Sequence, residues 1–378
     1  MENYLNYKKE EMISLLEKLV NIDSGTYYKK GVDKLGLILK DRFEEAGLKV
    51  DIHSEEKYGN CLEIKSPENK YPDIIIIAHM DTVFEEGEAE KRPFTISGDK
   101  AYGPGVNDEK ASLVSLLYAI KALKKNSTEA YKNVHIILNS DEEVGSPIST
   151  KIIKTAAENK KYAIVLECGR PFGGLVTARK GVGTYTMNIK GKSAHAGAEA
   201  KKGINAIYEL SQKVNELQKL NGIEEGISVN VGKIDGGTSA NTIPAHAHAK
   251  IDVRVENHKQ INIIKEKITK IADKSFVDGT TTELTGGIER LPMKETEDNK
   301  RLFHIVERIG KEMGLDLKAI HTGGASDASI TSNLGIPTID GMGPVGENSH
   351  SETDEYTELA TFVERTLLLA KTIEALTG

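Results

Sequence analysis

The sequence has no tryptophan, only two cysteines and no long apolar run. Cys61 and Cys168 do not form a CxxC motif, so neither a disulfide framework nor a cysteine-based zinc site is predicted. No apolar stretch approaches the roughly 18 residues that a membrane span requires. The segment 1–9 lacks the apolar core and the small-residue cleavage site of a secretory signal. These absences predict a cytoplasmic protein with no membrane partner.

An excess of positive charge is also missing. The chain has 50 lysines and arginines against 57 aspartates and glutamates, a net charge of -7, and the basic residues are scattered. A nucleic-acid partner would favour a basic face, so none is expected. A content of 38% hydrophobic and 28% charged residues is typical of a soluble globular protein. The length of 378 residues predicts two domains.

The first part of the chain alternates between helical and strand patterns, which predicts an α/β architecture. Helices are expected at 10–19 and 32–46, and strands at 48–54 and 60–65. The run Ile74–Ala78 is unbroken, apolar and mostly β-branched, which favours a strand buried on both faces of a parallel sheet.

His79 and Asp81 stand directly after this apolar run. In open α/β sheets, ligands bind outside the carboxyl ends of the strands. An imidazole is a metal ligand, and a nearby carboxylate can hold its other ring nitrogen. The pair therefore indicates a metal site, with an ordinary turn that happens to contain a histidine as the alternative.

Two further apolar runs end in carboxylates. The strand expected at 133–138 is followed by Asp141, Glu142 and Glu143, and the strand at 162–168 contains Glu167. A charge run is often a solvated surface, but these acids follow strands too apolar to be exposed. Clustered carboxylates repel one another unless a cation lies among them. We therefore expect a cation with nitrogen and oxygen ligands at one edge of the sheet.

Asp108 lies in a glycine-rich loop before a helix expected at 111–123. The spacing alone favours a helix N-cap for Asp108. Serine-hydrolase chemistry is the competing hypothesis for such a sheet, and the absence of a G-x-S-x-G motif argues against it.

The pattern changes near residue 183, where alternating strands replace the buried ones. The order β-α-β-β-α-β over about 110 residues predicts an inserted ferredoxin-like domain. We expect one domain formed by residues 1–181 and 293–378, and a second, inserted domain at 182–292. Glycine near 181–183 and proline at 292 are compatible with a hinge, so closure of the insert is a hypothesis.

Several polar residues lie in or after the insert. His195 lies in a loop of small residues and Arg254 in a strand. For each residue the alternative to a functional role is an ordinary surface position: an exposed histidine, and an arginine in a surface ion pair. Arginine also recognises carboxylates in a bidentate manner. His350 follows in an irregular loop where a fourth edge ligand can enter.

These segments together resemble the dizinc exopeptidases and deacylases that include bacterial glutamate carboxypeptidase, acetylornithine deacetylase, succinyl-diaminopimelate desuccinylase and aminoacylase. The motifs cover nearly the whole chain: His79-Met-Asp-Thr, Gly105-Val-Asn-Asp-Glu-Lys, Asp141-Glu-Glu-Val-Gly-Ser, Glu167, Gly191-Lys-Ser-Ala-His-Ala-Gly and His350. The glutamate carboxypeptidase branch is the most similar, through Arg290-x-Pro and Thr322-Gly-Gly-x-x-Asp-Ala. Ala111 departs from the glycine that relatives often have.

The resemblance implies a role for each residue of the edge. Asp108 would bridge two zinc ions, in place of the helix-cap role, with cobalt or manganese as alternatives. His79 and Glu167 would complete one metal site, and His350 and Glu143 the other. Asp81 would orient His79. Glu142 would be the general base that activates a metal-bridging water.

The resemblance also implies that residues 1–181 and 293–378 form a catalytic domain and that the insert at 182–292 is a lid or dimerisation domain. His195 would reach the active site of a neighbouring subunit in a homodimer formed through the insert, and would stabilise the oxyanion. The residues that would hold the free carboxylate of the substrate are Asn241, Arg254, Arg290 and Gly324. Asp327 would shape its loop, and Lys180 either touches substrate or only marks the domain junction.

The expected function is the hydrolysis of an amide bond next to a C-terminal carboxylate, which releases an amino acid, with glutamate as the first candidate. The substrate is then a small peptide. An N-acyl amino acid deacylase is the alternative with the same site chemistry. A catalytically silent metal-binding relative is the alternative of another class, and the presence of Glu142 beside all five ligands argues against it.

Overall fold

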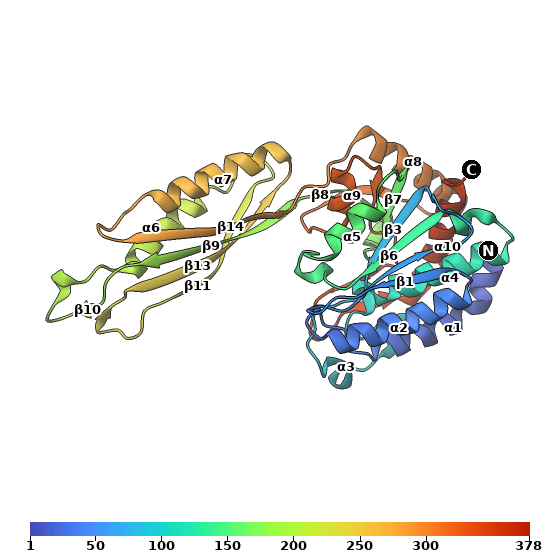
Figure 1. Ribbon diagram of the computed structural model, residues 1–378, viewed down its shortest axis with the longest axis horizontal. Coiled ribbons are helices and arrows are strands. Elements are labelled where there is room, and N and C mark those ends of the chain that lie inside the picture. The colour runs from blue at the N-terminus through green and yellow to red at the C-terminus, as the bar shows by residue number, and fades with distance from the viewer. The chain divides into compact units, whose positions relative to one another are not determined.

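Two units fold around separate apolar cores in the computed structural model, which describes all 378 residues. The first unit contains residues 1–178, 295–321 and 326–378, and the second contains 179–294 and 322–325. Figure 1 shows the two units with their elements labelled. Residues 322–325, a short piece of the glycine-rich loop, join the second unit although they lie far beyond the insert in sequence.

A six-stranded sheet forms the centre of the first unit, in the order β1-β2-β6-β3-β7-β16. Its strands are β1 (Lys49–His53), β2 (Cys61–Lys65), β3 (Ile74–His79), β6 (Val134–Asn139), β7 (Tyr162–Val165) and β16 (Thr338–Ile339). The four strands from β6 to β16 are parallel, and the pair β1–β2 is antiparallel. The predicted, mostly parallel α/β sheet is confirmed.

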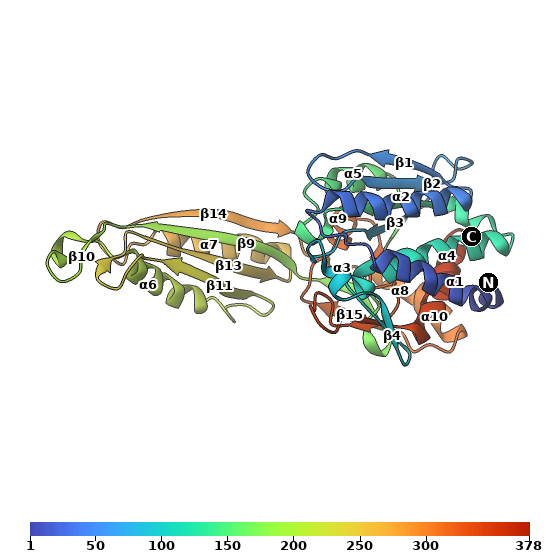
Figure 2. The same ribbon diagram turned by 90° about the horizontal axis from the view of Figure 1, so that it is seen from below.

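Helices cover both faces of this sheet. They are α1 (Glu2–Val20), α2 (Lys29–Glu45), α4 (Ala111–Lys125), α5 (Ser149–Ala156), α8 (Glu297–Glu312), α9 (Ala328–Asn333) and α10 (Leu359–Ala375), while the short α3 (Glu88–Lys91) lies in the connection between β3 and β4. Figure 2 shows α5 and the group α1, α4 and α10 on opposite sides of β3. Because both faces are covered, every residue of β3 is buried, as its unbroken apolar sequence predicts.

Smaller sheets flank the centre. One contains β4 (Thr95–Ser97), β5 (Lys100–Tyr102), β17 (Gly346–Glu347) and β18 (Tyr356–Glu358), in the order β17-β18-β5-β4. The other pairs β8 (Gly174–Arg179) with β15 (Lys318–Thr322). β4 and β5 form a hairpin that turns at Gly98, whose φ of 63° favours glycine. β18 places the C-terminal loop beside β5.

The second unit is a four-stranded antiparallel sheet with two helices. Its elements are β9 (Gly181–Lys190), β10 (Ala194–His195), α6 (Ala206–Gln218), β11 (Ser228–Gly236), β12 (Thr242–Ile243), β13 (His246–Val255), α7 (His258–Asp273) and β14 (Thr281–Arg290). The sheet order β11-β13-β9-β14 is that of a ferredoxin-like fold, which confirms the predicted class of the insert. Every second residue of β9 is buried, so one sheet face packs on the helices.

The sequence patterns missed some elements. α5 and β8 were not predicted, and β7 ends at Val165, earlier than the apolar pattern suggests. None of the helices combines the length and the apolar content that crossing a bilayer requires.

Candidate metal centre

The parallel register of three central strands brings the predicted ligands together. His79 at the end of β3 is opposite Asn139 at the end of β6, and Ile77 is opposite Val165 at the end of β7. The residues after β6 and β7 therefore emerge beside His79. Two groups of possible ligand residues form here: His79 with Glu109 and Glu167, and His79 with Asp108 and Glu143. Within each group, the ligand atoms lie within 4.8 Å of one another.

His79 is buried and its two ring nitrogens have different partners. Nδ1 lies 2.9 Å from the main-chain carbonyl oxygen of Asp81, and a carbonyl can only accept. Nδ1 therefore carries a proton, and Nε2 faces Asp108 Oδ1 at 3.0 Å. The sequence suggested that the Asp81 carboxylate holds this ring. Its nearer oxygen lies 3.5 Å from Nδ1, so the main-chain carbonyl makes the shorter contact.

The Asp81 carboxylate also holds the neighbouring loop. It is fully buried and accepts hydrogen bonds from the Thr26 hydroxyl at 2.7 Å and from the main-chain N–H groups of Glu142 and Glu143 at 3.2 Å each. One carboxylate thus fixes the start of the turn Glu142–Val144.

Asp108 lies between two imidazoles that come from distant parts of the chain. Its Oδ2 is 3.2 Å from His350 Nε2, and its Oδ1 faces His79. His350 Nε2 is also 3.3 Å from Glu143 Oε2. The helix-cap role that the spacing favoured for Asp108 is wrong, because Lys110 is the N-cap residue of α4 and no side chain caps that helix. The turn before α4 directs Asp108 away from the helix end.

The protonation behaviour of the cluster reflects its excess of carboxylates. Burial lowers the pKa of His79, but Glu109, Asp108 and Asp81 outweigh burial and hold that pKa well above its usual value. Hydrogen bonds to Asp108 and Glu143 raise the pKa of His350 to about 11. Burial raises the pKa of Glu143 and of Glu109. The site therefore favours positive charge in its midst.

Two buried carboxylate oxygens support a cation at this place. Glu143 Oε1 and Glu109 Oε2 are buried without a hydrogen-bond partner. A buried, unpaired carboxylate oxygen is costly unless a cation or a proton compensates it. Imidazole nitrogens and carboxylate oxygens are ligands of zinc and related divalent metals. The donor set therefore fits one or more divalent ions.

Glu109 is the site residue that the sequence reasoning missed. It is 1% exposed, and its Oε1 accepts the main-chain N–H of His79 while its Oε2 lies 4.0 Å from His79 Nε2. The sequence carried no signal for this, because a glutamate followed by a lysine in a polar loop is typical of an exposed segment.

A buried polar network holds the residues on either side of the turn at 142–144. The Asp141 carboxylate accepts the N–H groups of Ile148 and Ser149 at the start of α5, so it does not face the cluster. Asp327 accepts from Asn139 at 2.7 Å and from Ser146 at 2.5 Å. These contacts connect the loop of Asp327 to the end of β6.

His195 and the four predicted substrate residues all belong to the second unit, and those in the insert lie toward two ends of its sheet. His195 pairs with Thr242, and the carbonyl of Asn241 accepts from Ala196 N at 2.9 Å, near the end where His246 pairs with Lys190. Arg254 and Arg290 both lie opposite Val182, at the other end of β9. β9 has ten residues, and at about 3.3 Å per residue the two ends are about 30 Å apart.

The contacts of these residues differ. His195 is exposed, and its Nδ1 accepts the N–H groups of Gly197 and Ala198 at 3.2 and 3.1 Å. Arg254 donates to both oxygens of Asp252 and to the carbonyl of Gly323 at 2.7 Å. The contact with Asp252 is the ion pair that the alternative for Arg254 predicts. The Gly324 carbonyl accepts from Arg179 at 3.1 Å, and Arg290 is buried.

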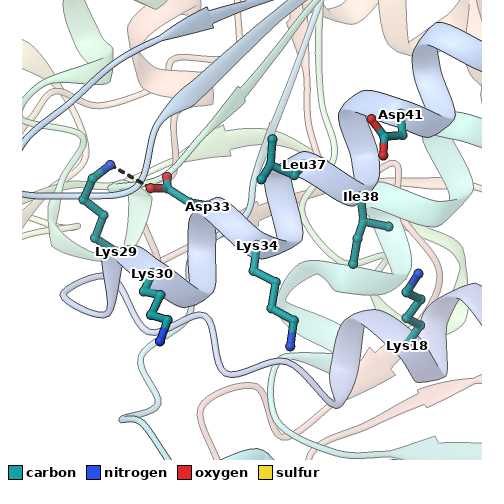
Figure 3. Close-up of a pocket in the computed structure, with 8 residues that line it drawn as sticks. All are labelled: Lys18, Lys29, Lys30, Asp33, Lys34, Leu37, Ile38 and Asp41. Carbon is teal, nitrogen blue, oxygen red and sulfur yellow. Dashed lines mark ion pairs between the residues drawn. The ribbon is translucent and has the colours of Figure 1, made fainter.

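An open groove of about 790 Å³ on α1 and α2 contains none of these residues. Figure 3 shows the four lysines, Lys18, Lys29, Lys30 and Lys34, that line it with Asp33, Leu37, Ile38 and Asp41. Lys29 forms an ion pair with Asp33 at 2.8 Å. The groove is therefore a surface feature with four lysines against two aspartates, separate from the predicted site residues.

Comparison with known proteins places the chain in a family. The profile of Peptidase family M20/M25/M40 matches residues 75–375. Carboxypeptidase G2 from Pseudomonas sp. (strain RS-16) is 28% identical over 366 residues, which cover 96% of this chain and 88% of the relative. Succinyl-diaminopimelate desuccinylase from Rickettsia rickettsii (strain Sheila Smith) is 26% identical over 384 residues, which cover 94% and 95%.

The fold agrees with this assignment. A tripeptidase structure from Staphylococcus aureus matches with a TM-score of 0.82 and 23% identity, covering 97% of this chain and 98% of the other. The matched profile includes the cluster from His79 to His350, and the resemblance seen in the motifs is confirmed. The chain therefore belongs to peptidase family M20/M25/M40 and is a hydrolase of the metallopeptidase type.

Proposed function

We propose that this chain uses two divalent metal ions, zinc in the first place, to hydrolyse the amide bond next to a free C-terminal carboxylate. One observation carries the proposal: the two oxygens of Asp108 face two different imidazoles, His79 at 3.0 Å and His350 at 3.2 Å. A carboxylate placed in this way is suited to be shared by two cations.

The remaining carboxylates divide between the two proposed metal positions, one beside His79 and one beside His350. Glu167 groups with His79, and Glu143 lies 3.3 Å from His350. When bound, two such ions polarise the scissile carbonyl and lower the pKa of water at the site. The unpaired Oε1 of Glu143 is available as a ligand atom, and Glu109 is a further carboxylate beside His79.

Glu142 is the proposed general base. Its main-chain N–H is held by Asp81, so the start of its turn is fixed relative to the strand that carries His79. The Glu142 carboxylate would take a proton from the attacking water and later deliver it to the nitrogen of the leaving amine, so that it ends each cycle ionised.

His195 is the proposed oxyanion donor, supplied by a second copy of the chain. Because Nδ1 of His195 accepts two main-chain N–H groups, Nε2 carries the proton and can donate to a developing negative charge. The separation of His195 from Arg254 along β9 supports the second copy. If both residues touch one small substrate, they must come from different subunits.

The free carboxylate of the substrate is assigned to Asn241, Arg254, Arg290 and Gly324. For Arg254 this requires exchange of an existing partner, because its guanidinium already binds both oxygens of Asp252. The arginine can recognise a carboxylate of the substrate in the same bidentate manner.

An N-acyl amino acid deacylase is the second candidate, and the name of one relative favours it. The relatives include a carboxypeptidase and a desuccinylase at similar identity. A panel of dipeptides, tripeptides and N-acyl amino acids, assayed for released amine, separates the two. We expect the highest kcat/KM for peptides with a C-terminal acidic residue. A preference for acyl amino acids would favour the deacylase.

Metal removal tests the dependence on divalent ions that both candidate functions share. Dialysis against a chelator should abolish hydrolysis, and stepwise addition of zinc, cobalt or manganese should restore it, with two ions bound per chain measured by atomic emission. Full activity in a metal-free sample would contradict the proposal, and a metal-loaded sample inactive on the whole panel would favour the silent relative.

A further inference from the structure

Glu355 is buried at 0% exposure in the loop that follows His350, and its carboxylate is directed at a segment about 250 residues earlier in the chain. Its Oε1 accepts the main-chain N–H groups of Asn107 and Asp108 at 3.0 and 3.1 Å. Its Oε2 accepts the N–H of Gly105 at 3.0 Å. One side chain therefore holds three main-chain donors around Asp108.

The turn that carries Asp108 needs such support. Asp108 and Glu109 have φ/ψ angles of -116°/90° and -135°/38°, which are not helical. Gly105 has a φ of 71°, which favours glycine. A regular helix satisfies its N–H groups internally after the first turn, but this irregular turn does not. The Glu355 carboxylate takes the place of those internal partners.

A second contact joins the same two loops. The Asn107 side chain donates to the Ser349 hydroxyl at 2.8 Å, directly before His350. His350 itself has a φ of 69°, an uncommon conformation for a non-glycine residue. The Asn107–Ser349 bond and the Glu355 bonds therefore act on the relative position of Asp108 and His350, whose side chains are 3.2 Å apart.

We infer that Glu355 is a positioning residue: it holds the Asp108 carboxylate against His350 through three main-chain N–H groups, and so sets the affinity of the metal ion that these two residues share. The inference rests on the proposed function, because it assumes that Asp108 and His350 bind metal. Groups that hold metal ligands in place typically change metal affinity by about 10- to 100-fold when they are replaced.

The test is a titration of metal-free protein with Co²⁺, followed by calorimetry and by the visible absorption of the bound ion. Glu355→Gln keeps the shape of the side chain but replaces one acceptor oxygen with a donor NH₂ group. We expect a folded variant in which one binding step is about 10- to 100-fold weaker. The Co²⁺ spectrum should also change, and kcat should fall with little change in KM.

Two further variants make the result decisive. Glu352→Gln makes the same change at an exposed residue of the same loop and should match the wild type in every measurement. Asn107→Ala removes the bond to Ser349 and should weaken the same binding step. A folded Glu355→Gln with wild-type Co²⁺ affinity and spectrum would overturn the inference. If Glu355→Gln does not fold, Glu355→Asp takes its place: it keeps the charge but shortens the side chain that reaches the three N–H groups, and wild-type Co²⁺ affinity and spectrum in this variant would overturn the inference.

The titration of the wild type separates this inference from the proposed function on which it rests. Binding of two Co²⁺ ions by the wild type with no effect of Glu355→Gln contradicts only the positioning role. Failure of the wild type to bind two ions contradicts the proposed metal centre, and the inference falls with it.

Discussion

The buried carboxylate of Asp81 accepts the main-chain N–H of Glu142 at 3.2 Å. This bond links the end of β3 to the turn that carries the proposed general base. In Asp81→Asn one acceptor oxygen becomes a donor NH₂ group. At Oδ1 this group opposes the Glu142 N–H, and at Oδ2 it opposes the Glu143 N–H and the Thr26 hydroxyl. We expect kcat to fall by about 10- to 100-fold while KM changes little.

Steady-state kinetics on the preferred substrate measure this effect. Thr26→Val removes one donor to Asp81 but leaves both main-chain N–H groups in place, so its kcat should fall less. Equal losses in the two variants would mean that Asp81 does not act through the Glu142 turn.

Replacement of Glu142 by glutamine should remove the proton carrier and leave the proposed ligands in place. We expect the variant to bind two metal ions per chain and to lose at least about two orders of magnitude in kcat. Metal analysis and steady-state assays are made on the same sample. Hydrolysis near the wild-type rate would remove Glu142 from the role of general base.

A mixture of two inactive variants tests whether His195 acts in a second copy. In a symmetric dimer, subunit exchange between Glu142→Gln and His195→Ala would produce heterodimers with one complete site, which should restore about a quarter of the wild-type activity. The activity is measured before and after exchange at matched protein concentration. No gain after proven exchange would place His195 in the site of its own chain or outside any site.

Glu63 predicts a pH dependence of stability that is separate from catalysis. Its carboxylate contacts His135 at 2.9 Å, Lys65 at 2.8 Å and His53 at 2.8 Å, and the hydrogen bond from His135 is the main cause that lowers the pKa of Glu63. A carboxylate with a lowered folded-state pKa stabilises the fold above its unfolded pKa of about 4.3, and this contribution is lost as the pH falls below that value.

Urea denaturation of the wild type and of Glu63→Gln at several pH values checks this expectation. The difference in unfolding free energy should be about 1 kcal/mol at pH 6, because the group is partly exposed, and should shrink below about pH 4. A difference that stays constant down to pH 3 would show that ionisation of Glu63 is not the cause.

The two thiols should be unreactive in the folded protein. Burial raises the pKa of Cys61 and of Cys168 to about 12, so the thiolate fraction at pH 8 is very small. We expect no rapid reaction with a disulfide reagent in buffer and reaction of two thiols per chain in concentrated urea. Rapid labelling of the native protein would mean that one of these regions opens readily.

Much of the fold followed from local patterns. The apolar run of β3 indicated a strand covered on both faces, and the alternating strands after residue 183 indicated a sheet with one packed face. Parallel strands end at a common edge, so the sequence also predicted that His79, Glu143 and Glu167 would approach one another. Short elements such as α5 were missed because eight residues carry too little periodicity to be distinguished from a loop.

The sequence by itself determined which residue types reach the edge of the sheet, because strand burial and strand direction depend on local hydrophobic patterning. Only the tertiary structure decided what each polar group contacts: Asp108 faces two imidazoles instead of capping α4, Asp81 holds the Glu142 turn, and Glu109 is buried beside His79. Such choices depend on which donors packing brings within about 3 Å of a buried oxygen, and those donors come from segments that are remote in sequence.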